Sequence, residues 1–132
     1  EIASNGTINQ PIKDELISNF IDMKYPRADD ITAYTAPFLK RFEEYKEIPV
    51  NDLLRTLVEV TAEKIKEFYK YCDFPKEIIF HGGGTLNKTL MKTIAEKISN
   101  DIQTTDHIVP SKYMESSAFA YLAFADKGVL FK

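Results

Sequence analysis

The chain has 132 residues, of which 44% are hydrophobic, and a formal net charge of −3 at pH 7. This length suits a single domain over residues 1–132, and the weak negative charge argues against a broad nucleic-acid footprint. The only cysteine, Cys72, excludes an internal disulfide framework and indicates a reducing, intracellular setting, and no apolar run approaches the ~20 residues of a membrane-spanning helix.

The amino-terminal segment is expected to be extended, with a turn at Asn5-Gly6 that would form a hairpin if strands flank it. Asn9 is a suitable N-cap for a helix that has Pro11 in its first turn. The apolar face of this helix is expected to consist of Ile12, Leu16, Ile17 and Phe20.

Residues 24–37 predict a loop, because Pro26 and Pro37 each disfavour helix at the residue before them, and residues 38–45 predict a short helix. The clearest helix is expected from an Asn51 cap to Tyr71. Apolar residues at helical spacing predict its buried face: Leu54, Leu57, Val58, Thr61, Ile65 and Phe68. Charged residues predict its solvated face: Glu59, Glu63, Lys66, Glu67 and Lys70.

Residues 77–81 form a short β-rich run whose apolar residues are contiguous, which predicts a strand buried on both faces. A helix capped by Asn87 follows, with an apolar face formed by Leu90, Met91, Ile94, Ala95 and Ile98, and residues 101–105 predict a second strand. These elements indicate a β-loop-α-β unit with parallel strands. The last helix, 113–126, is apolar nearly all round, so we expect it to be covered on most sides before it stops at Gly128.

The segment "HGGGTLN" at 81–87 holds three of the five glycines in the chain. Glycines between a strand and a helix expose backbone N–H groups and let a ligand approach the main chain closely. We therefore expect a nucleotide site at this point; the alternative is a tight turn without a ligand. The G-x-x-x-x-G-K-[ST] and G-x-G-x-x-G patterns are both absent, which argues against a P-loop or a dinucleotide fold.

His81 and the glycines also spell the oxyanion-hole motif of some esterases, but the chain lacks the G-x-S-x-G nucleophile motif that should accompany it. His81 and His107 are interpreted as structural. One cysteine and two distant histidines do not have the spacing of a metal site, so none is predicted.

The runs "EIIFHGGGTLNKTLMKTIAEKI", "IQTTD" and "ESSAFAYLAFA" resemble the carboxyl-terminal part of anhydro-N-acetylmuramic acid kinases. These enzymes belong to the superfamily of sugar kinases, actin and heat-shock ATPases. The opening "EIASNGTINQPIKDELI" resembles the family segment that follows its active-site aspartate. The resemblance departs from the family at residues 24–37, where only Pro26 and Arg27 loosely match the usual Pro-Lys-Ser-Thr-Gly-Arg-Glu.

The resemblance implies an α/β fold: the C-terminal subdomain of an actin-like (ribonuclease H-like) ATPase, with a small, mostly parallel sheet and packed helices. It implies that Gly82, Gly83 and Gly84 lie against the adenosine of ATP, with Asn87 nearby. Thr104, Thr105 and Asp106 match a Thr-Thr-Asp segment of the family. Glu115 matches a family glutamate that either faces the sugar or favours the helix N-terminus.

The family's phosphate-binding and catalytic-aspartate motifs lie upstream of this chain, which is expected to be the second half of a longer two-domain kinase. We therefore expect no catalytic residue and no activity in this chain alone. The intact parent is expected to use ATP and Mg²⁺ to open and phosphorylate 1,6-anhydro-N-acetylmuramic acid, in cell-wall sugar recycling in the bacterial cytoplasm. Two alternatives stay open: a non-catalytic binding or assembly module and another sugar kinase of the superfamily. Self-association as a homodimer is also open, whereas nucleic-acid and membrane partners are not expected.

Overall fold

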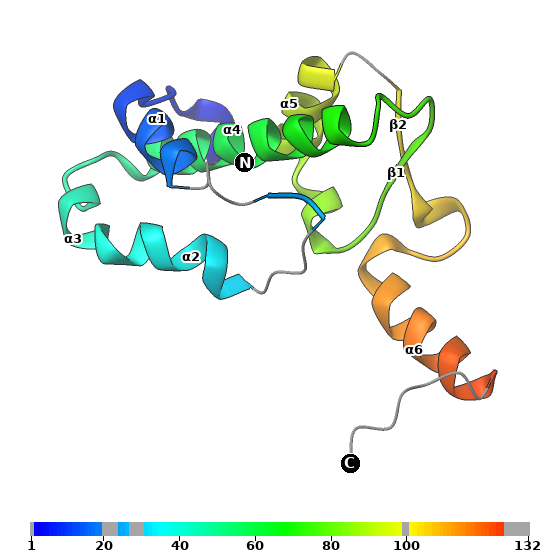
Figure 1. The fold of residues 1–132 in the computed structure, drawn as a ribbon. Coiled ribbons are helices and arrows are strands. Elements are labelled where there is room, and N and C mark those ends of the chain that lie inside the picture. Colours follow the sequence, from blue (N-terminus) through cyan, green and yellow to red (C-terminus); the bar gives the residue numbers. More distant parts are fainter. Residues whose placement is uncertain (1, 20–23, 27–30, 99–100, 126–132) are drawn as a thin grey trace.

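The computed structural model describes residues 2–19, 24–26, 31–98 and 101–125. This part of the chain is mostly helical, with one small parallel sheet of two strands. In chain order, with η for 3₁₀ turns, the elements are η1 (Ala3–Asn5), α1 (Gln10–Ser18), α2 (Ile31–Lys40), α3 (Phe42–Tyr45), α4 (Val50–Tyr71), β1 (Ile78–Phe80), η2 (Gly83–Leu86), α5 (Lys88–Ile98), β2 (Ile102–Thr104), η3 (Thr105–His107), η4 (Ser111–Tyr113) and α6 (Met114–Phe124). Figure 1 shows α4 as the long central helix, with α1 and α5 beside it. Among the described helices, none has the length and apolarity needed to cross a membrane.

The amino-terminal segment is fastened to α4. No strands flank Asn5-Gly6, so the hairpin is not formed; η1 turns the chain, and Gly6 then passes so close to α4 that a Cβ on it would lie 2.0 Å from the carbonyl oxygen of Asn51. The Asn9 cap is confirmed, because its side chain accepts a hydrogen bond from the backbone N–H of Ile12. Ile12 and Leu16 are buried as predicted, whereas Phe20 lies outside the described residues.

The predicted loop over 24–37 is wrong from Ile31 onward, where α2 begins and runs through Pro37. A proline inside a helix lacks one backbone donor, which made the loop the better prediction from local signals. Tertiary packing stabilises the helix instead: the Phe38 ring lies 5.4 Å from that of Tyr45, and Phe38 packs on the cluster formed by α1, α3 and α4. Residues 27–30, including Arg27, lie outside the described part.

Helix α4 begins one residue before the predicted Asn51 cap, and no side-chain hydrogen bond caps it. Its buried face is also wider than predicted, because α1 packs on one side and α5 on the other. The buried positions on this helix are Thr56, Val58, Glu59, Val60 and Ala62, whereas Leu54, Thr61 and Phe68 are exposed.

Glu59 was predicted on the solvated face and is instead buried, with 6% of its surface exposed. Its carboxylate pairs with Lys97 of α5, and it lies 3.6 Å from Lys13 Nζ of α1 and 3.6 Å from Arg55 Nη2. Glu63 joins the same group, 2.7 Å from Lys97 Nζ. A buried carboxylate needs such partners, so Glu59 and Glu63 link the three helices through an ion-pair network, in addition to the apolar clusters between the same helices.

The β-loop-α-β unit is confirmed: β1 and β2 pair in parallel, with Ile78 opposite Ile102 and Phe80 opposite Thr104. The apolar face of α5 is also confirmed, since Ile94 and Ile98 form a buried cluster with Ala62 of α4. The inward strand residues Ile78, Phe80 and Ile102 pack on this cluster. Burial of the strand on both faces is wrong, because Ile79, which points to the other face, is 50% exposed.

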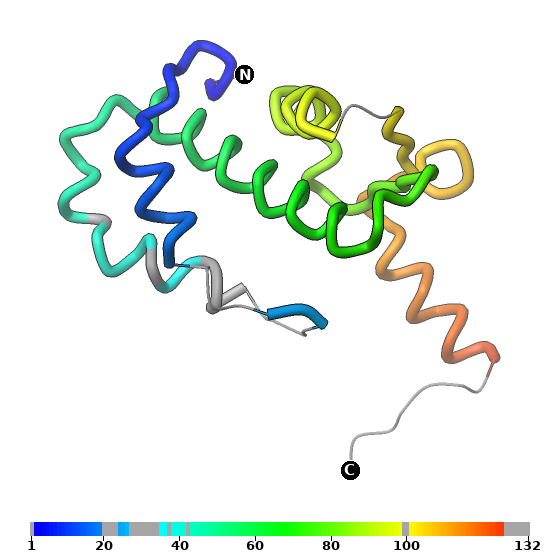
Figure 2. The backbone as a smooth tube through the Cα atoms, turned by 45° about the horizontal axis from the view of Figure 1, so that its top comes forward, coloured from blue at the N-terminus to red at the C-terminus, as the bar shows by residue number. Residues whose placement is uncertain are grey.

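The expectation that the last helix is covered on most sides is also wrong for the described residues. α6 has no buried residue, and Phe119, Tyr121, Leu122 and Phe124 are exposed, the last by 90%. Figures 1 and 2 show α6 extending away from the α4–α5 pair. Gly128 lies outside the described residues, so the predicted stop remains a prediction.

Candidate functional site

The glycine run leads from β1 into α5 through the 3₁₀ turn η2. Gly82 has φ +92°, a conformation that favours glycine, and its carbonyl oxygen accepts hydrogen bonds from the backbone N–H and the hydroxyl of Thr85. A Cβ added to Gly82 or to Gly83 would meet no atom within 4 Å. The main chain is therefore open at these two positions, as close approach by a ligand requires.

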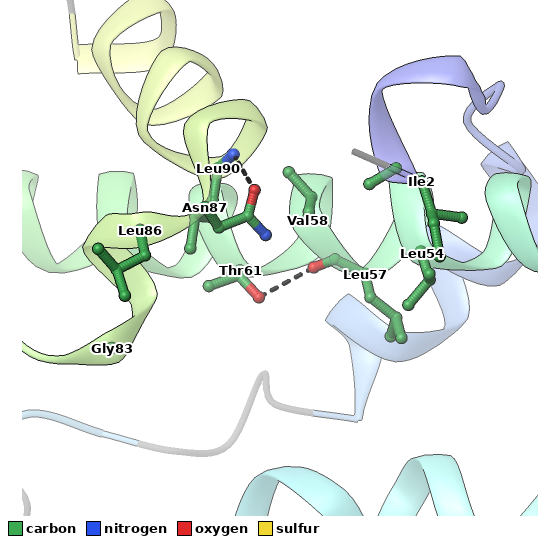
Figure 3. Close-up of a pocket in the computed structure, with 10 residues that line it drawn as sticks. Ile2, Leu54, Leu57, Val58, Thr61, Gly83, Leu86, Asn87 and Leu90 are labelled. Atoms are coloured by element: carbon green, nitrogen blue, oxygen red, sulfur yellow. Dashed lines mark hydrogen bonds between the residues drawn. The ribbon is translucent and has the colours of Figure 1, made fainter.

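A pocket of about 620 Å³ lies between this turn and α4 (Figure 3). Apolar side chains of α4 form one wall, the turn and the start of α5 form the other, and Ile2 lies at one end. Its lining residues are Ile2, Ala3, Leu54, Leu57, Val58, Thr61, Gly83, Leu86, Asn87 and Leu90. The pocket is wide open to solvent, but its size and mostly apolar lining are within the range of small-molecule sites.

The polar groups at this pocket are few. Asn87 caps α5, as predicted, and its Oδ1 accepts a hydrogen bond of 3.0 Å from the Leu90 N–H. The Thr61 hydroxyl donates to the carbonyl of Leu57 within α4, at 2.9 Å. With its oxygen used in the cap, the Asn87 side chain has its amide nitrogen, a hydrogen-bond donor, directed to the pocket side in Figure 3.

The structure brings together only part of the predicted site. Gly83 and Asn87 line the pocket, whereas Gly82 and Gly84 belong to the same turn but are not among the lining residues. Glu115 lies exposed in the first turn of α6 and lines neither this pocket nor the second one described below. Their roles as nucleotide and sugar contacts remain predictions.

Sequence reasoning missed the residues that α4 and the amino-terminal segment contribute to the pocket. Leu54, Leu57, Val58 and Thr61 were assigned to a packed face, and their helical spacing did identify them as one surface. No local pattern indicates that Ile2 would join them, because its position depends on how Gly6 meets α4.

The loop after β2 is hydrogen-bonded to the glycine run. Asp106 accepts hydrogen bonds from the Ser111 N–H, at 2.7 Å, and from the Thr104 hydroxyl, at 2.8 Å. These bonds, the Ser111 backbone first, hold the pKa of Asp106 below its ordinary value. The Ser111 carbonyl in turn accepts a 2.8 Å hydrogen bond from the Gly82 N–H, so the two loops are joined.

The remaining candidate groups are dispersed. His81 is exposed after β1, and His107 Nδ1 lies 3.0 Å from the carbonyl oxygen of Thr104. Within the described ranges, no group of three or more His, Cys, Asp or Glu side chains is arranged to hold a metal ion. A second pocket, of about 310 Å³, is lined by residues with polar or charged side chains: Ser4, Arg55, Lys88, Thr89, Lys92, Thr93 and Glu96.

Comparison with known proteins gives a consistent result. The sequence profile of the anhydro-N-acetylmuramic acid kinase family matches residues 1–128. Three curated relatives bear the name anhydro-N-acetylmuramic acid kinase: one from a gamma-proteobacterium (EBAC31A08), 32% identical over 93% of this chain, one from Francisella tularensis subsp. novicida, 31% over 92%, and one from Vibrio parahaemolyticus, 30% over 93%.

The aligned regions make up 34%, 34% and 35% of those three relatives, so the chain spans about a third of their length. The family match covers both the amino-terminal segment on α4 and the β1–α5–β2 unit with its glycine run. The chain therefore belongs to the anhydro-N-acetylmuramic acid kinase family.

Proposed function

We propose that this chain is the adenosine-binding, carboxyl-terminal part of an ATP-dependent kinase that opens and phosphorylates 1,6-anhydro-N-acetylmuramic acid. The observation that supports it most directly is the open main chain at Gly82 and Gly83 beside an apolar pocket. In this proposal the chain forms one unit of an actin-like ATPase fold in a longer two-domain protein, and acts in the bacterial cytoplasm.

The pocket suits the flat, apolar faces of an adenine ring. Leu57 and Val58 of α4 would contact one face, and Gly83 with Leu90 the other. Gly83 lines the pocket, and a Cβ added to it would stand in open space with no atom within 4 Å, so we expect a larger side chain there to compete with the ring. Glycine at this position therefore leaves room for the ring, which is the role that the sequence predicted for the run.

ATP, when bound, would supply the phosphoryl group, with Mg²⁺ accompanying its phosphates. The proposed contribution of this chain is limited to binding and orienting the nucleoside, and the catalytic groups would come from the remaining two thirds of a protein of the relatives' length. The chain by itself is therefore expected to bind adenine nucleotides weakly and to transfer no phosphate. Glu115 is proposed as a sugar contact of the assembled protein.

Calorimetric titration of ADP and adenosine into the purified chain tests the proposal. Gly83→Val is expected to abolish binding, because its side chain occupies the space meant for the ring, while the circular dichroism spectrum stays unchanged. Ala118→Val, which places the same valine side chain at an exposed position on α6, is the control and should bind as the wild type does. Equal binding by Gly83→Val would contradict the proposed site.

A second candidate function, an assembly module, is favoured by the exposed apolar surface of α6. Sedimentation velocity over a range of chain concentrations separates the two. A chain that self-associates through α6 and gives no response to adenosine supports the assembly module; a monomer that binds adenosine supports the kinase part.

A further inference from the structure

The loop from Thr105 to Ser111 is organised around one carboxylate. Asp106 Oδ1 accepts from the Ser111 N–H at 2.7 Å, and Oδ2 accepts from the Thr104 hydroxyl at 2.8 Å. Behind it, the Thr105 hydroxyl lies 3.3 Å from the Ser111 hydroxyl in a contact that is buried. Asp106 thus ties the end of β2 to Ser111, and Ser111 is itself 2% exposed and fixed in place.

Ser111 connects this hydrogen-bonded loop to the glycine run. Its carbonyl oxygen accepts the N–H of Gly82 at 2.8 Å, and the carbonyl oxygen of Gly82 is held from the other side by Thr85. Gly82 is therefore anchored at both of its backbone polar groups, in a conformation with φ +92° that glycine reaches at no steric cost. Since glycine loses more backbone freedom on folding than other residues, we expect this anchoring of Gly82 to restrict the position of the adjoining Gly83.

We propose that Asp106 is a positioning residue for the nucleotide site, acting through the backbone of Ser111 on Gly82 and so on the open surface of the glycine run. The inference rests on the proposed function, because it assigns a role toward the same nucleotide. It also gives a physical task to Asp106, which does not line the pocket and which the sequence analysis matched to a family segment without assigning it a role.

Charge is part of this arrangement. A hydrogen bond from a backbone N–H to an ionised carboxylate is stronger than one between neutral groups. Asp106→Asn keeps an oxygen that accepts from the Ser111 N–H but loses the charge, whereas Asp106→Ala loses the bond altogether. If Asp106 only fixes its own loop, both variants should change the amide exchange rate of Ser111 and leave the amide exchange rate of Gly82 unchanged.

Amide hydrogen exchange of the ¹⁵N-labelled full chain measures the coupling without any nucleotide. Asp106→Ala is expected to speed exchange at Gly82 about tenfold, the effect of losing one hydrogen bond to a charged group. Asp106→Asn should give a smaller increase. Asp101→Asn, the same change at an exposed carboxylate at the start of β2, is the control and should leave Gly82 as in the wild type.

Unchanged exchange at Gly82 in Asp106→Ala, with faster exchange at Ser111, would overturn the proposal. If the alanine variant does not fold, Asp106→Asn and Thr104→Val decide instead, because each weakens the carboxylate's bonds and both should speed exchange at Gly82. Slower or equal exchange in both would likewise overturn it.

A parallel ADP titration connects the coupling to the site. Asp106→Ala is expected to raise the Kd for ADP about tenfold, and Asp101→Asn to leave it unchanged. Equal ADP affinity in Asp106→Ala and the wild type overturns the positioning role. A wild-type chain that binds no ADP overturns the proposed function and the nucleotide part of this inference, and the exchange rates then still decide whether Asp106 holds Gly82.

Discussion

Helices α5 and α6 each have 11 residues, many of them apolar, yet one face of α5 is buried whereas α6 is exposed. α5 has its apolar residues on one face, and that face is buried, with Ile94 1% exposed. α6 is apolar around nearly its whole circumference and has no buried residue. An amphipathic stripe specifies which face packs, and the chain supplies its partner in α4. A helix that is apolar all round specifies several covering surfaces, and none of the described residues provides them.

The largest expected effect on stability comes from shortening a buried side chain of α5. Ile94→Ala should lower the free energy of unfolding by about 2–5 kcal/mol, because it leaves a cavity between α4 and α5. Phe119→Ala on α6 removes a larger side chain that is 66% exposed and should change stability by less than about 0.5 kcal/mol. Urea denaturation followed by circular dichroism measures both; a comparable loss in Phe119→Ala would show that α6 is packed after all.

The buried ion-pair network gives the next largest effect. Glu59→Gln removes the charge that faces Lys97, Lys13 and Arg55, and should lower the free energy of unfolding by about 1.5–3 kcal/mol. Glu115→Gln makes the same change on the exposed first turn of α6 and should be nearly neutral. If the two variants unfold at the same urea concentration, the network does not stabilise the helix contacts.

Gly6→Ala tests how closely the amino-terminal segment approaches α4. The added Cβ would lie 2.0 Å from the carbonyl oxygen of Asn51, so the segment must move and stability should fall by about 1–3 kcal/mol. Gly83→Ala is the matched control for stability, because its Cβ meets no atom within 4 Å. Thermal denaturation of both variants checks this, and an unshifted Tm for Gly6→Ala would contradict the close approach.

Acidification should affect the α1–α4–α5 contacts. Burial opposes ionisation of Glu63, but its hydrogen bond to Lys97 and the charges of Lys97, Lys13 and Lys66 hold its pKa below the ordinary value. A carboxylate whose pKa is lower in the folded state contributes stability above its ordinary pKa of about 4, and this contribution is lost as pH falls through the lowered value.

The measurement is the urea midpoint of wild type and Glu63→Gln at neutral pH and at a pH below the ordinary carboxyl range. On acidification, the urea concentration at the unfolding midpoint should fall further for the wild type than for the variant. Parallel losses in the two proteins would mean that Glu63 contributes nothing to the pH dependence.

Local signals predicted the β1–α5–β2 unit, because the glycine run, the Asn87 cap and the one-sided apolar pattern all lie within it. The Asn9 cap was predictable for the same reason. The burial of Glu59 was not, since a glutamate on a helix looks the same whether it faces water or the lysines of two other helices. Helix α2 was missed because its proline argued against it, whereas the packing of Phe38 that favours it is tertiary and leaves no local signal.

The same division holds for the candidate site. Gly83 and Asn87 were identified from a short stretch of sequence, whereas Ile2 reaches the pocket only through the way its segment lies on α4. The side chains of α4 were recognised as one surface but taken for core, since a face that lines a pocket and a face that packs have the same periodicity. Tertiary contact, and not residue type, decides between them.

A sheet of two strands has another consequence for handling the protein. Each strand has one side whose backbone N–H and C=O groups have no strand partner among the described residues, and β1 consists of Ile78, Ile79 and Phe80. Such edges are templates for strand addition from other molecules. Charged side chains beside a strand oppose this, because strand addition would remove them from water, and Lys76 and Glu77 precede β1, so we expect the chain to aggregate more readily when both are replaced by apolar residues.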